Sequence, residues 1–349
     1  MFQILRASAL TRLLRTQLAP RGLDLLDSIS ARTTWRPNVK VRWFDEWAPV
    51  LDDALASLPE LEFCKHSLFS EIARTPGPTK KRLALVTQGG EPIAVACIRR
   101  RKTFWEPVLE NCIPLSTFPT KPGALGVAVD ALGLEVRIGG YPEDPSPLRP
   151  TSAEPYAIFR ADLTGDYEAH WRAKHRMTEI RQARKRTATL KLRWDEPGDV
   201  AWIVRAWKEM WKDDPEQQAV VAGDDRLIAS QRLMSEGRLH CALLLDDDHP
   251  VGGVTLVPQG STLYLHCMGR DLARGSQSLG TRLHDECFAW GVRSGYKAID
   301  FGGGVDYKRW WAPHAADRYQ LVFEPKGIAL AKSLARRARA LRKIEGDPP

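Results

Sequence analysis

Residues 262–311 read TLYLHCMGRDLARGSQSLGTRLHDECFAWGVRSGYKAIDFGGGVDYKRWW and carry the strongest structural signal in the chain. An apolar strand at 262–268 leads into a Gly/Ser-rich loop at 274–280, and a helix follows at about 278–293. A second short buried strand is expected at 297–301. Because the two strands are joined through a helix, they are expected to pair in parallel within one sheet.

The start of the predicted helix is a candidate anion site. The apolar side chains of the helix recur at helical spacing, at Leu279, Leu283, Cys287 and Trp290. The helix begins at small residues, so its first backbone N–H groups and the positive end of its dipole can face a phosphate. We therefore expect a phosphate to be held by Gly275, Ser276, Gln277, Ser278, Leu279 and Gly280.

A strand–turn–strand pattern occurs twice in the chain, about 158 residues apart. The first copy is expected at 82–87 and 92–98, and the second at 240–245 and 250–257. In the ungapped register, Ala84, Leu85, Val86, Pro92 and Ile93 align with Ala242, Leu243, Leu244, Pro250 and Val251. A repeat at about half the chain length predicts two similar domains in tandem.

Residues 262–311 resemble the core of the GNAT acyltransferases, in the branch related to the FemAB aminoacyltransferases and the BioF2-like or cellulose-biosynthesis (CelD-like) acetyltransferases. The resemblance rests on the loop and helix start at 276–283, on Gly295, on the strand end Ile299-Asp300-Phe301-Gly302-Gly303-Gly304, and on Asp306-Tyr307-Lys308 followed by Trp310-Trp311. It implies an α/β fold of two tandem GNAT-like domains, each a mixed central sheet flanked by helices.

Four segments are expected along the chain. They are a basic N-terminal extension at 1–37, a degenerate GNAT-like domain at 38–150, a GNAT-like domain with the donor site at 151–326, and a basic C-terminal helix or tail at 327–349. The Pro-rich run at 142–155 marks the expected boundary between the two domains.

The composition limits the classes of protein that the chain can belong to. With 349 residues, 43% of them hydrophobic and 27% charged, the chain is typical of a soluble globular protein of one large or two medium domains. A net charge of +8 attracts phosphates, CoA, nucleic acid or anionic lipid without choosing among them. The sequence has no apolar run long enough for a transmembrane helix, and no G-x-x-x-x-G-K-[ST] loop, which disfavours nucleotide hydrolysis.

The cysteines and histidines predict neither a disulfide framework nor a structural metal. The six cysteines form no C-x-x-C pair, and the eight histidines show no H-x-x-x-H spacing. Most of the cysteines lie within apolar runs, as reduced core residues of a cytoplasmic protein do. The first 23 residues carry four arginines and no acid, which we interpret as a basic amphipathic arm or an over-extended start.

Residues 167–190 are helical by composition and strongly basic. Their basic side chains are Arg172, Lys174, His175, Arg176, Arg181, Arg184, Lys185 and Arg186. Two interpretations stay open, a solvated helix face and a contact for phosphates or polyanions. FemAB-like proteins carry a basic helix at about this place, so the resemblance favours the second interpretation.

Acyl transfer to an amine needs a place for the phosphates of the donor, a polarised donor carbonyl and an acceptor for the amine proton. We expect the loop before the helix to hold the phosphates. A backbone N–H at the end of strand 262–268 would polarise the carbonyl, since GNAT-like enzymes often open their strands there. By resemblance, Tyr307 would protonate the leaving thiolate and Lys308 would hold a phosphate or carboxylate.

The candidates for the base are Asp300, Asp306 and His266, with His284 as a further candidate. Asp300 lies at the end of a predicted parallel strand, where open α/β sheets place their sites. Each candidate has a structural alternative. Asp300 can be a capping carboxylate, Lys308 a partner in a salt bridge, and each histidine a satisfied core residue.

The resemblance implies a cytoplasmic N-acyltransferase that moves an acyl group, expected to be acetyl, from acyl-CoA to an amine of a sugar, lipid or peptide. Envelope or exopolysaccharide synthesis is the expected setting. Two alternatives stay open: a FemAB-type aminoacyltransferase that uses aminoacyl-tRNA, and a non-catalytic basic protein on a GNAT scaffold. A contact with tRNA and a peripheral membrane contact are therefore partner hypotheses, without a transmembrane segment.

Overall fold

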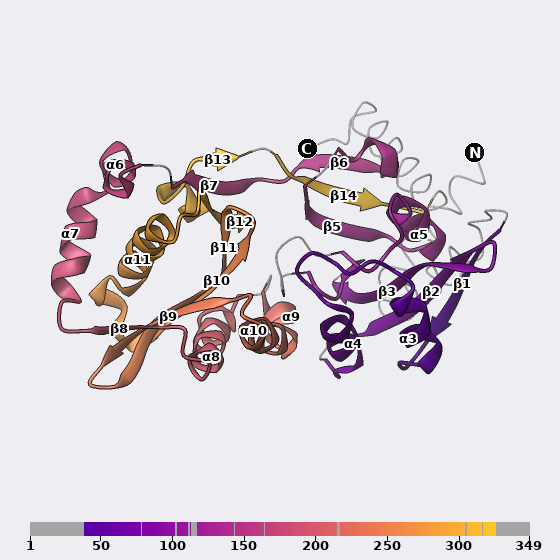
Figure 1. Ribbon diagram of the computed structural model, residues 1–349, viewed down its shortest axis with the longest axis horizontal. Helices are drawn as coiled ribbons and strands as arrows, with labels where there is room; N and C mark the ends of the chain where they lie inside the picture. The colour runs from indigo at the N-terminus through magenta and orange to yellow at the C-terminus, as the bar shows by residue number, and fades with distance from the viewer. Residues whose placement is uncertain are drawn as a thin grey trace, which may run out of the picture.

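The computed structural model describes residues 38–325 apart from 78, 102, 111, 113–116, 143, 164, 215–216, 304–305 and 316, and it does not place the side chains of 219–220, 275–277, 306 and 314. The expected N-terminal extension, 1–37, and C-terminal tail, 327–349, lie outside the described residues. The chain forms two α/β units that lie side by side (Figure 1).

The first unit is built on a mixed sheet with the strand order β1-β2-β3-β4-β5-β14-β6, in which only β4 and β5 are parallel neighbours. Its strands are β1 (Val39–Phe44), β2 (Lys81–Gln88), β3 (Glu91–Arg101), β4 (Phe104–Pro107), β5 (Val136–Tyr141), β6 (Ser152–Pro155) and β14 (Tyr319–Phe323). Its helices are α3 (Pro49–Ala56), α4 (His66–Arg74), α5 (Leu125–Leu132) and the 3-10 turn η1 (Ser146–Leu148).

The second unit is built on a mixed sheet with the order β8-β9-β10-β11-β12-β7-β13, in which only β11 and β12 are parallel neighbours. Its strands are β7 (Ile158–Asp162), β8 (Lys191–Trp194), β9 (His240–Asp246), β10 (His249–Gln259), β11 (Thr262–Arg270), β12 (Ala298–Gly303) and β13 (His314–Ala315). Its helices are α6 (Tyr167–Ala173), α7 (Met177–Arg186), α8 (Asp199–Trp211), α9 (Gln218–Val221), α10 (Asp225–Ser235), α11 (Leu279–Arg293), and the 3-10 turns η2 (Leu272–Gln277) and η3 (Asp306–Trp310).

Two buried clusters cover the faces of the second sheet. Helices α6, α7 and α11 contribute to one cluster, which belongs to the second unit alone. Helices α8 and α10 contribute to the other cluster, which continues into the core of the first unit. The interface between the units is therefore a hydrophobic core, and burial of apolar area holds the two units together.

The first five strands of each sheet follow one another in the same order, and neighbouring strands have the same relative directions throughout both sheets. This confirms the repeat predicted from the two hairpins. Strands β3 and β10 are both 11 residues long and show the same succession of exposed and buried positions. Each pairs with its hairpin partner through a one-residue bulge, at Ile93 in β3 and at Val251 in β10. These bulges are 158 residues apart, the spacing found in the sequence.

The two units exchange strands. Only residues 156–157 separate β6 from β7, yet β6 pairs in the first sheet and β7 in the second. In the same way, β13 pairs in the second sheet, and β14 crosses back to lie between β5 and β6 (Figure 1). Both β6 and β14 fall within 151–326, the range expected for the second domain, but they complete the first sheet. A single boundary in the sequence therefore does not separate the strands of the first sheet from those of the second.

The starts and ends of two helices follow from their local sequence. Helix α3 begins at Pro49 and has Ala48 as N-cap. Proline favours the first helical position because its fixed φ suits the helix and its missing N–H needs no partner there. The basic stretch 167–190 forms two helices rather than one, because the chain turns at His175, whose φ is 55°.

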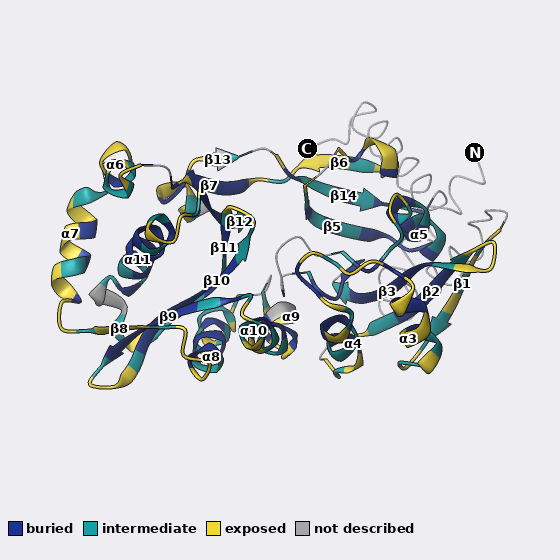
Figure 2. Cartoon of the chain, in the orientation of Figure 1, coloured by how far each residue is buried: buried dark blue, intermediate teal, exposed yellow. Residues whose placement is uncertain are grey.

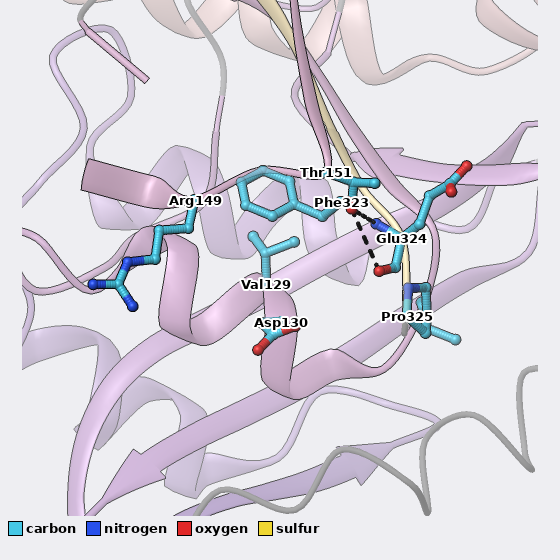
Figure 3. A pocket seen from close by; sticks show the side chains of 8 residues that line it. Val129, Asp130, Arg149, Thr151, Phe323, Glu324 and Pro325 are labelled. Carbon is cyan, nitrogen blue, oxygen red and sulfur yellow. Dashed lines mark hydrogen bonds between the residues drawn. The ribbon is translucent and has the colours of Figure 1, made fainter. Parts of the chain in front are cut away.

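The end of β14 is fastened to the first unit. The Thr151 N–H donates to the Val322 carbonyl over 2.8 Å, and the Glu324 N–H donates to Thr151 Oγ1 over 2.8 Å. A pocket beside this contact has a volume of about 30 Å³ and is lined in part by Val129 and Arg149 (Figure 3). This is room for about one water molecule, so the pocket is a packing gap at the strand end rather than a ligand site.

Candidate functional site

Strands β11 and β12 part soon after they pair. Their parallel ladder has three residue pairs, and the last joins Tyr264 to Asp300. Beyond it, β11 continues to Arg270 and β12 to Gly303 with no further pairs between them in the described chain. The ladder between β10 and β11 is shifted by one residue at His266, and such a bulge bends a strand away from its neighbour. The strands thus open after Tyr264, before the end of strand 262–268, where the resemblance implies the opening.

The start of α11 has the features of an anion site. Ser278 is the N-cap residue, with φ 58° and no capping bond from its side chain, and the first turn carries no acid. The Nη1 group of Arg186 donates to Ser278 Oγ over 3.1 Å. Free N–H groups, the helix dipole and a guanidinium therefore meet at one point.

The six residues expected to hold the phosphate differ in what the structure shows of them. Gly275, Ser276 and Gln277 lie at the end of η2, and the structure describes only the backbone of these three residues. Leu279 is buried in the core, so it can offer a ligand only its backbone N–H. A Cβ added at Gly280 would meet nothing nearer than Met268 Sδ, at 4.0 Å, so the helix start is open at this residue.

Helix α7 is fixed on α11 by an ion pair. Arg184 donates to both carboxylate oxygens of Asp285, over 2.7 and 2.9 Å, and Asp285 also accepts from Trp171 Nε1 at 3.2 Å. The hydrogen bond to Asp285 raises the pKa of Arg184. This contact sets the position of Arg186 above the start of α11. The role of the pair Arg184–Asp285 was not predicted from the sequence. The only signal for it was the charged residue Asp285 within a helix expected to pack on the sheet.

Asp300 is buried at the end of β12 and fully engaged. Its Oδ1 accepts from the Gly302 N–H over 2.6 Å, and its Oδ2 lies 3.3 Å from Arg160 Nη2 and 3.6 Å from Arg318 Nη2. Arg160 also pairs with Asp317 over 2.5 Å. Arg160 lies in β7, and Arg318 directly precedes β14. Asp300 therefore links β7 and the start of β14 to β12. This geometry matches the structural alternative for Asp300.

Lys308 closes the end of β12 from η3. Its ammonium donates to the carbonyls of Phe301 and Gly303, over 2.6 Å each. Burial lowers the pKa of Lys308 to about 8, although nearby Asp300 opposes the shift. An ammonium has three N–H donors, so one remains beside the parted strands. The two carbonyl contacts make Lys308 part of the strand end rather than of the helix start.

The other two candidates in η3 are Tyr307 and Asp306. The Tyr307 side chain is 40% exposed, and partial burial raises its pKa above the ordinary value. Its hydroxyl is therefore protonated at neutral pH and can donate a proton. Asp306 begins η3, and its side chain is outside what the structure places.

Both candidate histidines are engaged and neutral at pH 7. His266 Nε2 lies 2.7 Å from the Cys112 carbonyl of the first unit, and burial lowers its pKa to about 3. His284 Nδ1 lies 2.6 Å from the Gly280 carbonyl, and burial lowers its pKa to about 4. The His284 ring stacks on Trp311 with 4.2 Å between centroids. Both therefore match the structural alternative of a satisfied core histidine.

His284→Phe is expected to make the protein less sensitive to acid. In the wild type, His284 of the unfolded chain binds a proton below pH 6.5, but His284 of the folded chain binds one only below about pH 4. The free energy of unfolding therefore falls as the pH is lowered from 6.5 to 4. The variant loses the bond to Gly280, at a cost of about 1 kcal/mol at pH 7. Urea unfolding at several pH values should show this deficit shrinking toward pH 5. Parallel curves for the two proteins would contradict it, and exposed His249→Phe is the control.

Sequence reasoning also missed what holds η3 in place. His170 Nε2 lies 2.6 Å from the Trp311 carbonyl, and Lys174 Nζ donates to the Arg309 carbonyl over 3.3 Å. The guanidinium of Arg176 lies 4.7 Å from the ring centroid of Trp311. The junction of α6 and α7 therefore positions the segment that carries Tyr307 and Lys308.

Within the described part of the chain, no cluster of three or more His, Cys, Asp or Glu side chains is placed to bind a metal. All six cysteines are free and buried. None of the described helices combines the length and the apolar character that crossing a bilayer requires.

Comparison with known proteins finds one family model that matches a part of the chain. Residues 174–310 match the family model of the acetyltransferase (GNAT) domain. A search of curated proteins finds no match. The fold is similar to the C-terminal domain (DUF2156) of a protein described as a lysylphosphatidylglycerol synthetase from Agrobacterium fabrum, with 12% identity, a TM-score of 0.50, and 82% of this chain and 96% of that chain covered.

Two further solved structures are similar at comparable coverage. L-PGS from Bacillus licheniformis shows 13% identity and a TM-score of 0.49, with 84% of this chain and 97% of that chain covered. FemX shows 12% identity and a TM-score of 0.45, with 83% of this chain and 99% of that chain covered. At these identities the likeness concerns the fold.

Proposed function

Residues 174–310 of this chain match an acetyltransferase (GNAT) domain, and on that premise we propose that the protein moves an acyl group from acyl-CoA to an amine. One observation carries the proposal. Strands β11 and β12 part directly beside the start of α11, where free N–H groups and Arg186 favour an anion. A thioester with a phosphate-bearing tail needs both features at once, an open strand pair and an anion site.

The donor would lie along the opened strands. Its phosphates would contact the backbone N–H groups at Leu279 and Gly280, with Arg186 and Ser278 at the side. The backbone of β11 beyond Tyr264 forms no ladder pair with β12 in the described chain, so its unpaired polar groups would pair with the amide groups of the donor. This arrangement places the thioester near the end of β12.

Three residues that follow β12 would supply the chemistry. The remaining N–H donor of Lys308 would polarise the thioester carbonyl, whose oxygen gains negative charge as the amine attacks. Tyr307 would protonate the departing thiolate. Asp306 is our candidate for accepting the proton of the amine. Since Asp300, His266 and His284 are engaged elsewhere, we do not assign the proton transfer to them.

The acceptor in this proposal is an amine of a sugar, lipid or peptide, and the reaction would take place in the cytoplasm as a step of envelope or exopolysaccharide synthesis. A second donor, aminoacyl-tRNA, is favoured by one observation. Arg181 and Lys185 on α7 are exposed and have no ion-pair partner among the described residues, and a polyanion would neutralise them.

Calorimetry with acetyl-CoA and a longer acyl-CoA, at two salt concentrations, tests the proposal. We expect one site per chain, and binding at least about 100-fold weaker in Gly280→Glu, because a carboxylate at the helix start repels the phosphates. The variant should fold, since a Cβ at this residue has room. Gly280→Ala is the matched control and should bind like the wild type.

The possible outcomes separate the two donors. If folded wild type binds neither acyl-CoA but forms a salt-sensitive complex with aminoacyl-tRNA, the CoA proposal is wrong and the tRNA donor replaces it. If Gly280→Glu and Gly280→Ala bind acyl-CoA equally well, the start of α11 is not the phosphate site.

A further inference from the structure

The outer face of α7 is cationic. Ile180 and Ala183 of this helix are buried toward α11, and the opposite side carries Thr178, Arg181, Gln182 and Lys185, which are all exposed (Figure 2). Arg184 and Arg176 have acidic partners, Asp285 and Glu179. Arg181 and Lys185 have none within the described chain, so their charge is free to meet a partner.

Exposed apolar side chains lie at both ends of this helix. Trp310 is 51% exposed, and the guanidinium of Arg176, directly before α7, lies 5.5 Å from its ring centroid. At the other end, Arg186 bonds Ser278, and the segment directly before Ser278 is η2, where Leu272 is 48% exposed. In the described chain, the exposed large apolar residues are Leu272, Tyr307 and Trp310.

We propose that Trp310, the outer face of α7 and Leu272 form one surface that binds bilayers containing anionic lipid. A helix of ten residues is about 15 Å long, so the two apolar side chains lie on either side of a compact patch of positive charge. Lysine and arginine are drawn to the negative surface of such a bilayer. Tryptophan and leucine beside them can enter the headgroup region.

A bilayer explains more of this surface than a nucleic acid does. RNA would neutralise Arg181 and Lys185, but its sugar–phosphate backbone offers no apolar phase for exposed Leu272. A bilayer accounts for the cations and for both exposed apolar side chains together. The inference does not depend on acyl transfer, because it rests on the exterior of α7, η2 and η3 alone.

Co-sedimentation of the full-length chain with lipid vesicles tests the proposal. We expect binding to vesicles of phosphatidylcholine and phosphatidylglycerol that weakens with salt, and little binding to phosphatidylcholine alone. Arg181→Gln with Lys185→Gln should weaken binding about 25-fold, since each charge near an anionic surface contributes about fivefold. Arg293→Gln with Lys297→Gln removes the same charge from exposed residues at the far end of α11 and should bind like the wild type.

A second pair of variants separates a bilayer from other polyanions. Leu272→Ser with Trp310→Ser should weaken vesicle binding at least about tenfold, through lost apolar burial, and leave its salt dependence unchanged. If this pair is poorly folded, as judged by its thermal melt, Leu272→Ser alone is the test. The proposal would be overturned if the two charge variants lost vesicle binding equally, or if the serine variants lost none. Binding to tRNA in the absence of vesicle binding would also overturn it.

Discussion

Asp300→Ala is expected to lower the free energy of unfolding by about 3–5 kcal/mol, because removing one partner of a buried ion pair leaves the others uncompensated. The change leaves Arg318, which is 5% exposed, without its carboxylate partner, and it removes the acceptor of the Gly302 N–H. It also removes the contact between Arg160 and Asp300, so β7 keeps its backbone ladder with β12 but loses this ion pair. Urea unfolding followed by tryptophan fluorescence measures this loss.

Two further variants show what kind of residue Asp300 is. Asp317→Ala breaks an exposed pair with the same Arg160 and should cost about 0–1 kcal/mol. Asp300→Asn keeps an acceptor for the Gly302 N–H and should be destabilised less than the alanine variant. If Asp300→Asn were as stable as the wild type but inactive, the structural interpretation would be wrong and Asp300 would belong to the chemistry.

Lys308→Met is expected to lower kcat about 100–1,000-fold, the typical effect of removing one donor that stabilises a developing oxyanion. The variant also leaves the carbonyls of Phe301 and Gly303 without their shared donor, so a thermal melt must accompany the kinetics. Lys191→Met, which removes an exposed lysine paired with Asp248, is the control and should leave kcat unchanged. A folded Lys308→Met with wild-type kcat would remove Lys308 from the mechanism.

The pKa of Lys308, at about 8, gives two dependences on pH with opposite signs. If the ammonium polarises the carbonyl, kcat falls as the pH rises through about 8, and Lys308→Arg, which stays charged, abolishes this fall. Stability changes the other way. Between about pH 8 and the ordinary lysine pKa of 10.5, the unfolded chain holds a proton that the folded chain has released, so the free energy of unfolding rises with pH. Lys308→Met should lack this rise.

The sequence predicts the strands and helices around the site closely, because their signals are local. Strand β11 begins at the expected Thr262, and α11 ends at the expected Arg293. Gly295, with φ 81°, follows the helix in the left-handed conformation that commonly ends a helix. The repeat was visible because two hairpins kept the same apolar pattern at the same spacing, down to the bulges at Ile93 and Val251.

The roles of the charged residues could not be predicted, because their partners come from distant parts of the chain. Asp300 pairs with Arg160, 140 residues earlier, so its spacing in the sequence carries no sign of a structural role. Alternating polarity can identify a strand such as β14, but it does not name the neighbours of that strand. Its place beside β5 follows from the exchange between the units, which only the three-dimensional structure reveals.

The exchange of strands also sets the time at which the first unit can finish folding. Strand β5 ends at Tyr141, and its neighbour β14 begins at Tyr319, about 180 residues later. At a synthesis rate of roughly 5–20 residues per second, the edge of β5 that pairs with β14 stays unpaired for on the order of 10–40 s. Uncovered edges recruit other strands, so the nascent chain is most prone to aggregation in this interval. The first sheet is therefore completed only near the end of synthesis, although most of its strands are made first.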